Sequence, residues 1–171
     1  LRLLQDAHAI LPGAPSIRRT LAGTLNLRGA GLARRDETAA AVRNYVRAME
    51  VDPTVPESYI NLARLYLASG GAETALEITA AGLEQKPDHA RLLAVRAETL
   101  IRTRQFAEAR GAAERALVIE PRTLEAHAAL ADALQRLGDN DGARAALEEG
   151  LRLYPDATEL TTRIRKLTPG S

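Results

Sequence analysis

The chain has 171 residues, of which 46% are hydrophobic, with one Phe, four Tyr and no Trp. This composition suits Ala and Leu packed between helices better than an aromatic-rich sheet. The absence of Cys excludes disulfides and thiolate metal sites, and it is compatible with either the cytoplasm or the periplasm. The net charge is only +1 and no apolar run approaches the roughly 20 residues of a membrane span, so neither nucleic-acid binding nor membrane insertion is expected.

The first segment, residues 1–14, is expected to be the end of a helix from an incomplete repeat. Leu4, Ala7 and Pro12 lie in places that match the second helix of the later repeats. We therefore expect the chain to begin within a repeat and to be a fragment of a longer protein. Apolar side chains left short of a neighbour would favour self-association through this segment. These side chains are Leu3, Leu4, Ile10 and Leu11.

Residues 15–55 form an irregular repeat. Helical patterns read forward from its first proline and backward from its last differ by seven residues, which is close to two helical turns. A longer first helix would keep Leu21 and Leu32 on one face, and this is the interpretation that we favour. In the alternative, the helix ends at Gly29 and a surface loop runs to Asp36.

Three regular repeats follow, at residues 56–89, 90–123 and 124–157. The prolines that end successive repeats stand 34 residues apart, a period that indicates a helical repeat architecture; they are Pro53, Pro87, Pro121 and Pro155. Small residues recur in step at places where helix axes must approach each other closely. They are Ala63, Ala97 and Ala131 in one column and Ala75, Ala109 and Ala143 in another.

Each regular repeat has the pattern of a helix hairpin, which predicts an all-α fold. In the first of them, apolar positions recur at helical spacing in residues 56–69 and again in residues 73–85. Gly70 and Gly71 separate the two runs, and glycine permits the left-handed conformation that ends a helix. The proline at the end of the repeat prevents the second helix from continuing.

The last segment, residues 158–171, is expected to be a capping helix and a tail. Leu160, Ile164 and Leu167 form an apolar stripe with polar and basic residues around it. Arg165 stands where the earlier repeats have alanine, which suits a helix with no following partner. The ends of a solenoid need such a polar outer face.

These residues together resemble the tetratricopeptide repeat family. The resemblance covers nearly the whole chain and is clearest at Tyr59, Leu62, Ala63, Tyr66, Ala75, Gly82 and Pro87. It implies one solenoid domain over residues 1–171, a right-handed superhelix of stacked antiparallel helix hairpins. It also implies a role as a scaffold or adaptor that binds other proteins. The pattern departs from the family locally, since Arg96 replaces the usual leucine.

No arrangement of residues indicates an enzyme, a cofactor or a metal site. His8, His89 and His127 fall in different repeats, and no catalytic or phosphate-binding motif accompanies them. His127 occupies a place that usually holds a bulky residue, so we interpret it as a packing residue. The alternative function is a repeat region of a larger enzyme, for example a transferase, that recruits a substrate or partner.

In proteins that resemble this chain, the first helix of each hairpin lines a concave groove that binds a peptide or a partner helix. The candidate groove residues are the polar side chains outside the apolar stripes: Glu57, Asn61, Arg64, Arg91, Glu98, Arg102, Glu125, Asp132, Gln135 and Arg136. In one hypothesis, the arginines of the groove receive carboxylates from an acidic segment or a chain terminus. In the alternative, Glu98 pairs with Arg102 and Asp132 with Arg136, four residues apart on a solvated face.

The partner is expected to be a protein or peptide. A carboxylate clamp like that of chaperone-binding members of the family is not expected: Asn61 and Arg91 suit it, but Val95 stands where the clamp has arginine. Arg outnumbers Lys 21 to 2, a bias of coding composition from which we infer a bacterial source.

Overall fold

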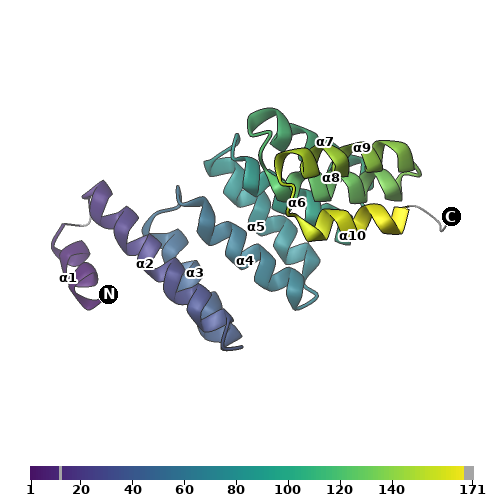
Figure 1. Ribbon diagram of the computed structural model, residues 1–171. Helices are drawn as coiled ribbons and strands as arrows, with labels where there is room; N and C mark the ends of the chain where they lie inside the picture. The colour runs from purple at the N-terminus through teal and green to yellow at the C-terminus, as the bar shows by residue number, and fades with distance from the viewer. Residues whose placement is uncertain (12, 168–171) are drawn as a thin grey trace. The chain divides into compact units, whose positions relative to one another are not determined.

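The computed structural model describes residues 1–11 and 13–167, and these residues form helices joined by turns, with no strand among them (Figure 1). The all-α prediction is confirmed. The proline at position 12 and the tail expected at 168–171 lie outside the described residues. In chain order the helices are α1 (Arg2–Ile10), α2 (Pro15–Ala33), α3 (Thr38–Val51), α4 (Pro56–Ala68), α5 (Ala72–Gln85), α6 (Ala90–Arg102), α7 (Phe106–Ile119), α8 (Leu124–Arg136), α9 (Asn140–Leu153) and α10 (Thr158–Leu167).

Contacts divide the chain into two compact units, which we call the N-terminal unit (Leu1–Pro87) and the C-terminal unit (Asp88–Ser171). The N-terminal unit contains the hairpins α2–α3 and α4–α5, with α1 packed on α2. The C-terminal unit contains the hairpins α6–α7 and α8–α9, with α10 packed on α9. The expectation of a single domain over residues 1–171 stays a prediction.

The turn inside each regular hairpin has one residue in the left-handed conformation. Gly70 has a φ of 83°, Arg104 of 63° and Gly138 of 88°, and these positions are one repeat period apart. The amide of the residue after each of them donates to a carbonyl five residues earlier, as from Gly71 to Tyr66 at 2.8 Å. This bond closes the end of the helix. Glycine adopts the conformation freely, whereas arginine adopts it at a cost.

The columns of small residues lie where helices touch. Ala75, Ala109 and Ala143 on the second helices are fully buried. Gly150 in α9 is tighter still, because a Cβ atom at this position would lie 2.6 Å from Cδ1 of Leu160 in α10. The spacing therefore records close helix contacts, since the side chains at a contact set the distance between helix axes.

The helix α2 continues through residues 29–31, where the alternative interpretation places its end. Gly29 is buried in this helix, and a Cβ atom there would lie 2.7 Å from Cε1 of Tyr45 in α3. Gly29 thus allows a close approach of the tyrosine ring to the helix backbone, and it does not break the helix. The helix ends at Ala33, and Asp36 in the following turn has a φ of 60°. The extended first helix is therefore the observed one.

A buried polar contact joins the two first helices of the N-terminal unit. Asn61 in α4 donates from Nδ2 to Oδ1 of Asn26 in α2 at 3.0 Å, and Asn26 is only 7% exposed. Burial of an amide is tolerated when it is hydrogen-bonded. The apolar core of this unit comes mainly from α2, α3 and α4 and includes Leu21, Leu25, Leu32, Tyr45 and Leu62.

The core of the C-terminal unit is built mainly from alanine and leucine. One cluster joins Ala97, Ala113 and Ala129 of α6, α7 and α8, and a larger one joins α8, α9 and α10 around Leu134, Leu147 and Leu160. Leu160 is completely buried, so the apolar stripe predicted for α10 faces the core. Among the described residues, no helix is long and apolar enough to cross a membrane.

Candidate protein-binding cleft

A cavity of about 520 Å³ lies in the C-terminal unit between α8 and α10. Its apolar lining comes from Ala131 on α8, Leu147 on α9 and Leu167 on α10. Its polar lining comes from α8 and α10, which occupy the first-helix place of their repeats. We call the whole cavity the α8–α10 cleft. Cavities of this size with an apolar floor and a few polar groups are typical binding sites.

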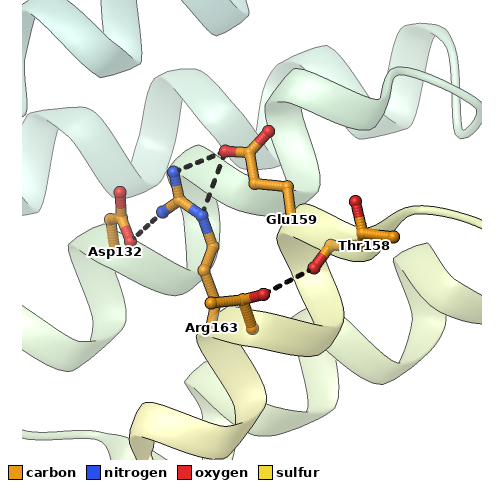
Figure 2. A network of polar contacts seen from close by, with 5 residues as sticks. Asp132, Thr158, Glu159 and Arg163 are labelled. Atoms are coloured by element: carbon orange, nitrogen blue, oxygen red, sulfur yellow. Dashed lines mark hydrogen bonds and ion pairs between the residues drawn. The ribbon is translucent and has the colours of Figure 1, made fainter.

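A bridge of charged side chains crosses the cleft. Arg163 of α10 donates from Nη1 to Oδ1 of Asp132 on α8, and from Nη2 to Oε1 of Glu159 on its own helix at 2.8 Å (Figure 2). Its Nε donates to the same Glu159 oxygen at 3.2 Å. The Arg163 side chain is 31% exposed, so it stands at the wall of the cleft with access to water.

The two carboxylates keep Arg163 charged. Burial alone lowers the pKa of Arg163, but hydrogen bonds and charge from Asp132 and Glu159 outweigh burial and leave that pKa raised above its usual value. Charge-assisted bonds of this kind are stronger than neutral ones and fix the planar guanidinium group. The bridge therefore holds α10 against α8 while the space beside it stays open.

The remaining polar groups of the cleft lie farther along the two helices. Gln135 on α8 and Lys166 on α10 are exposed and line the cavity. Thr162 also lines it, and its hydroxyl donates to the backbone oxygen of Thr158 at 2.8 Å. Along α10 the cleft thus changes from acidic at Glu159 to basic at Lys166.

The groove residues predicted on α8 differ in where the structure places them. Asp132 and Gln135 line the cleft. The expected pairing of Asp132 with Arg136 is wrong, because Asp132 binds Arg163 instead, and the guanidinium of Arg136 lies over the Phe106 ring at 5.9 Å from its centroid. Local spacing missed both contacts because each partner lies on another helix.

The groove residues predicted on α6 lie nearer the start of the C-terminal unit. Arg91 on α6 and Glu125 on α8 approach each other to 4.0 Å, a long and exposed pair of little energetic weight. Glu98 and Arg102 are exposed, and the described residues contain no ion pair between them. The predicted pairing along α6 is therefore not formed.

The other predicted groove residues, Glu57, Asn61 and Arg64, belong to α4 in the N-terminal unit. Asn61 is engaged with Asn26. Glu57 lines a smaller cavity of about 310 Å³, together with Arg19 and Lys86. Arg64 is half-buried.

Sequence reasoning missed Glu159, Arg163 and Lys166 as cleft residues because it treated α10 only as a cap. A signal was available in the repeat register. Arg163 stands one period after Ala129 and two after Val95, so a charged residue occupies a place that is apolar in the two repeats before it. Such a replacement indicates that the charged side chain faces either solvent or a partner of opposite charge.

The histidines lie apart from the cleft. His127 is 4% exposed and its Nε2 lies 2.9 Å from the Pro121 carbonyl oxygen, which agrees with a packing role. His89 caps α6 by accepting a hydrogen bond from the Leu92 amide at 3.2 Å. Within residues 1–11 and 13–167, no three His, Cys, Asp or Glu side chains are grouped so that they could hold a metal ion.

The fold and the cleft define a helical-hairpin repeat protein. Two sequence models, both described as Tetratricopeptide repeat, match residues 32–99 and 124–164. The chain belongs to the tetratricopeptide repeat family. It is also 32% identical over 110 residues to cellulose synthase operon protein C of Pseudomonas fluorescens (strain SBW25). That match covers 64% of this chain and 9% of the relative, so the chain spans less than a tenth of that protein.

Solved structures share the fold at low sequence identity. The chain is similar to pilF of Pseudomonas aeruginosa, with a TM-score of 0.78, 20% identity and coverage of 88% of this chain and 68% of that one. It is similar to a thermophilic TPR protein of Thermus thermophilus, with a TM-score of 0.70, 22% identity and coverage of 97% and 87%. MamA protein has a TM-score of 0.69, 18% identity and coverage of 86% and 80%.

Proposed function

We propose that this chain is a non-catalytic scaffold or adaptor that binds a peptide or a partner helix on the first helices of its hairpins. Repeats of this family generally mediate protein–protein interaction, and their fold is typically non-catalytic. The observation that carries the proposal is the α8–α10 cleft, because it combines a buried apolar floor with polar groups that remain open to water.

The proposed binding surface has one part in each unit. In the C-terminal unit it includes Asp132 and Gln135 in the cleft, with the predicted residues of α6 and the rest of α8 as further contacts. In the N-terminal unit it includes the three predicted residues of α4. A partner that contacts exposed side chains such as Gln135 and Arg102 needs no rearrangement of the core, which favours recognition by a rigid surface.

A variant that fills the cleft tests this function. Thr162→Trp places an indole at the cavity wall without removing any charged group of the Arg163 bridge. Ala145→Trp on an exposed position of α9 is the matched control, because it adds the same side chain away from the cavity. Proteins captured from a bacterial lysate by the immobilised chain are identified by mass spectrometry for the parent and both variants.

We expect a partner that the parent chain and Ala145→Trp retain and that Thr162→Trp loses. Equal retention by all three proteins would move the binding site away from the α8–α10 cleft. If chemical cross-linking before capture also yields no partner above background, the scaffold function is wrong. Circular dichroism of both variants checks that the helices remain folded.

A second candidate function is a recruiting region inside a longer protein. The match to cellulose synthase operon protein C favours this function, because the matched stretch is only 9% of that protein. The partner or substrate of a catalytic region elsewhere in such a protein would then be bound by the same cleft. This alternative predicts that Thr162→Trp in the full-length protein lowers turnover at limiting substrate concentration and leaves turnover at saturation unchanged.

A further inference from the structure

We infer that the α8–α10 cleft selects partner segments that place a lysine or arginine side chain at Asp132 and Glu159, with an aliphatic side chain about three residues away on the apolar floor near Leu167. This inference rests on the proposed function and adds the chemistry of the partner. Three features carry it: the charge of the bridge, the carboxylate oxygens that the bridge leaves open, and the position of Lys166.

The bridge carries one more negative charge than positive. Two carboxylates, from Asp132 and Glu159, surround the single guanidinium of Arg163. Arg163 removes the repulsion between the carboxylates but leaves an excess negative charge at this end of the cleft, because Lys166, the other basic side chain of the lining, lies farther along α10. A cation from a partner balances this local excess, whereas a further carboxylate would meet repulsion.

The carboxylates also have unused hydrogen-bonding capacity. Both bonds from Arg163 to Glu159 end on Oε1, and the bond to Asp132 ends on Oδ1. Among the described residues, no hydrogen bond reaches Glu159 Oε2 or Asp132 Oδ2. An ionised carboxylate has about four acceptor positions, so each can accept from a partner while it holds Arg163. Because Arg163 fixes both groups, they are arranged before the partner arrives, which lowers the entropic cost of binding.

Lys166 gives the cleft a direction. It lies seven residues after Glu159 on α10, about 10 Å farther along the helix axis. Its positive charge disfavours a basic side chain at that end and so restricts one to the end near Glu159. The apolar group Leu167 lies beside Lys166, so an aliphatic side chain of the partner belongs about three residues from the basic one in an extended segment.

The test is a selection of random peptides displayed on phage, with the whole chain as the target. We expect the selected peptides to share a Lys or Arg and, about three positions away, a Leu, Ile, Val or Met. A peptide from the selection is then synthesised with a fluorescent label, and its affinity is measured by anisotropy against the parent chain and its variants.

Two variants in the cleft separate the charges. Glu159→Gln keeps the bond between Arg163 and Asp132 and removes one acceptor charge, so the affinity should fall about two- to fivefold. Lys166→Gln removes a repelling charge from the same cleft and should leave the affinity unchanged or increase it. Glu149→Gln on α9 is the control for general charge effects, because Glu149 is paired with Arg152 outside the cleft and this variant should bind as the parent does.

The outcomes distinguish this inference from the proposed function. If the selected peptides are acidic, or if Thr162→Trp blocks binding while Glu159→Gln does not weaken it, the cleft binds peptides but the inferred charge preference is wrong. If peptides are selected but Thr162→Trp blocks none of them, the cleft is not a peptide site and the charge inference fails, while the scaffold function then depends on another surface. If no peptide binds the chain at all and no protein is captured from the lysate, the scaffold function fails as well. Asp132→Asn provides a second acceptor variant, with circular dichroism to check that α10 stays folded.

Discussion

Replacement of Gly150 by alanine tests how tightly the last three helices of the C-terminal unit are packed. The added Cβ atom would lie 2.6 Å from Cδ1 of Leu160, and 3.1 and 3.2 Å from Cβ and Cγ of His127. Ordinary carbon–carbon contacts are about 3.5–4.0 Å. Leu160 is completely buried and His127 is 4% exposed, so neither side chain has open space to move into.

The expected magnitude follows from two opposing effects. Overpacking of a filled core costs about 1–3 kcal/mol. Alanine is favoured over glycine inside a helix by about 0.5–1 kcal/mol, which offsets part of this cost. We therefore expect Gly150→Ala to lower the free energy of unfolding by up to about 2.5 kcal/mol.

Gly111→Ala is the matched control, because Gly111 lies inside α7 with no atom within 4 Å of its added Cβ. It should raise the free energy of unfolding by about 0.5–1 kcal/mol through helix propensity alone. The assay is urea unfolding followed by far-ultraviolet circular dichroism, with hydrogen exchange of the α10 amides as a local measure. Equal stability of the two variants, or unchanged exchange in α10, would show that the contact between Gly150 and Leu160 is not tight.

Arg104→Gly should raise the free energy of unfolding by about 0.5–1 kcal/mol in urea titrations, because Arg104 has a φ of 63° and glycine adopts this conformation without strain. Asn61→Ala should lower it by about 1–2 kcal/mol, since buried Asn26 loses its partner; the double variant with Asn26→Ala should cost less than the sum, and additive losses would contradict this. Burial raises the pKa of Tyr45, and the charge of Arg34 opposes part of this rise. The folded chain therefore disfavours the ionised phenol: the contribution of neutral Tyr45 to stability is complete below pH about 10 and is lost as the pH rises through the raised pKa. Tyr45→Phe should therefore reduce the loss of stability above pH about 10, as measured by urea midpoints at several pH values.

The sequence was sufficient to predict the periodic part of this fold. The two helices of the first regular hairpin lie within one residue of their predicted limits, since α4 spans Pro56–Ala68 and α5 spans Ala72–Gln85. A repeated pattern averages over several copies of one local structure, so its signal is strong. The irregular repeat has only one copy, and there the role of Gly29 depends on Tyr45, a residue on another helix.

The candidate site was less predictable because its contacts cross between helices. The spacing of Asp132 and Arg136 on one helix face suggested a local pair of about 0.2–0.5 kcal/mol. Arg163 offers Asp132 a stronger, more buried bond from α10, and Phe106 offers Arg136 an aromatic face. Sequence spacing gives neighbours along a helix, whereas the choice among partners depends on which other helices come near.

The equal spacing of the first helices has a consequence for how such a chain evolves. The helices α4, α6, α8 and α10 begin at residues 56, 90, 124 and 158, one period apart. Recombination between two copies at equivalent points would add or remove one whole hairpin, and the helices on either side of the junction would keep their order and spacing. The length of the array and the chemistry of its exposed side chains can therefore evolve separately.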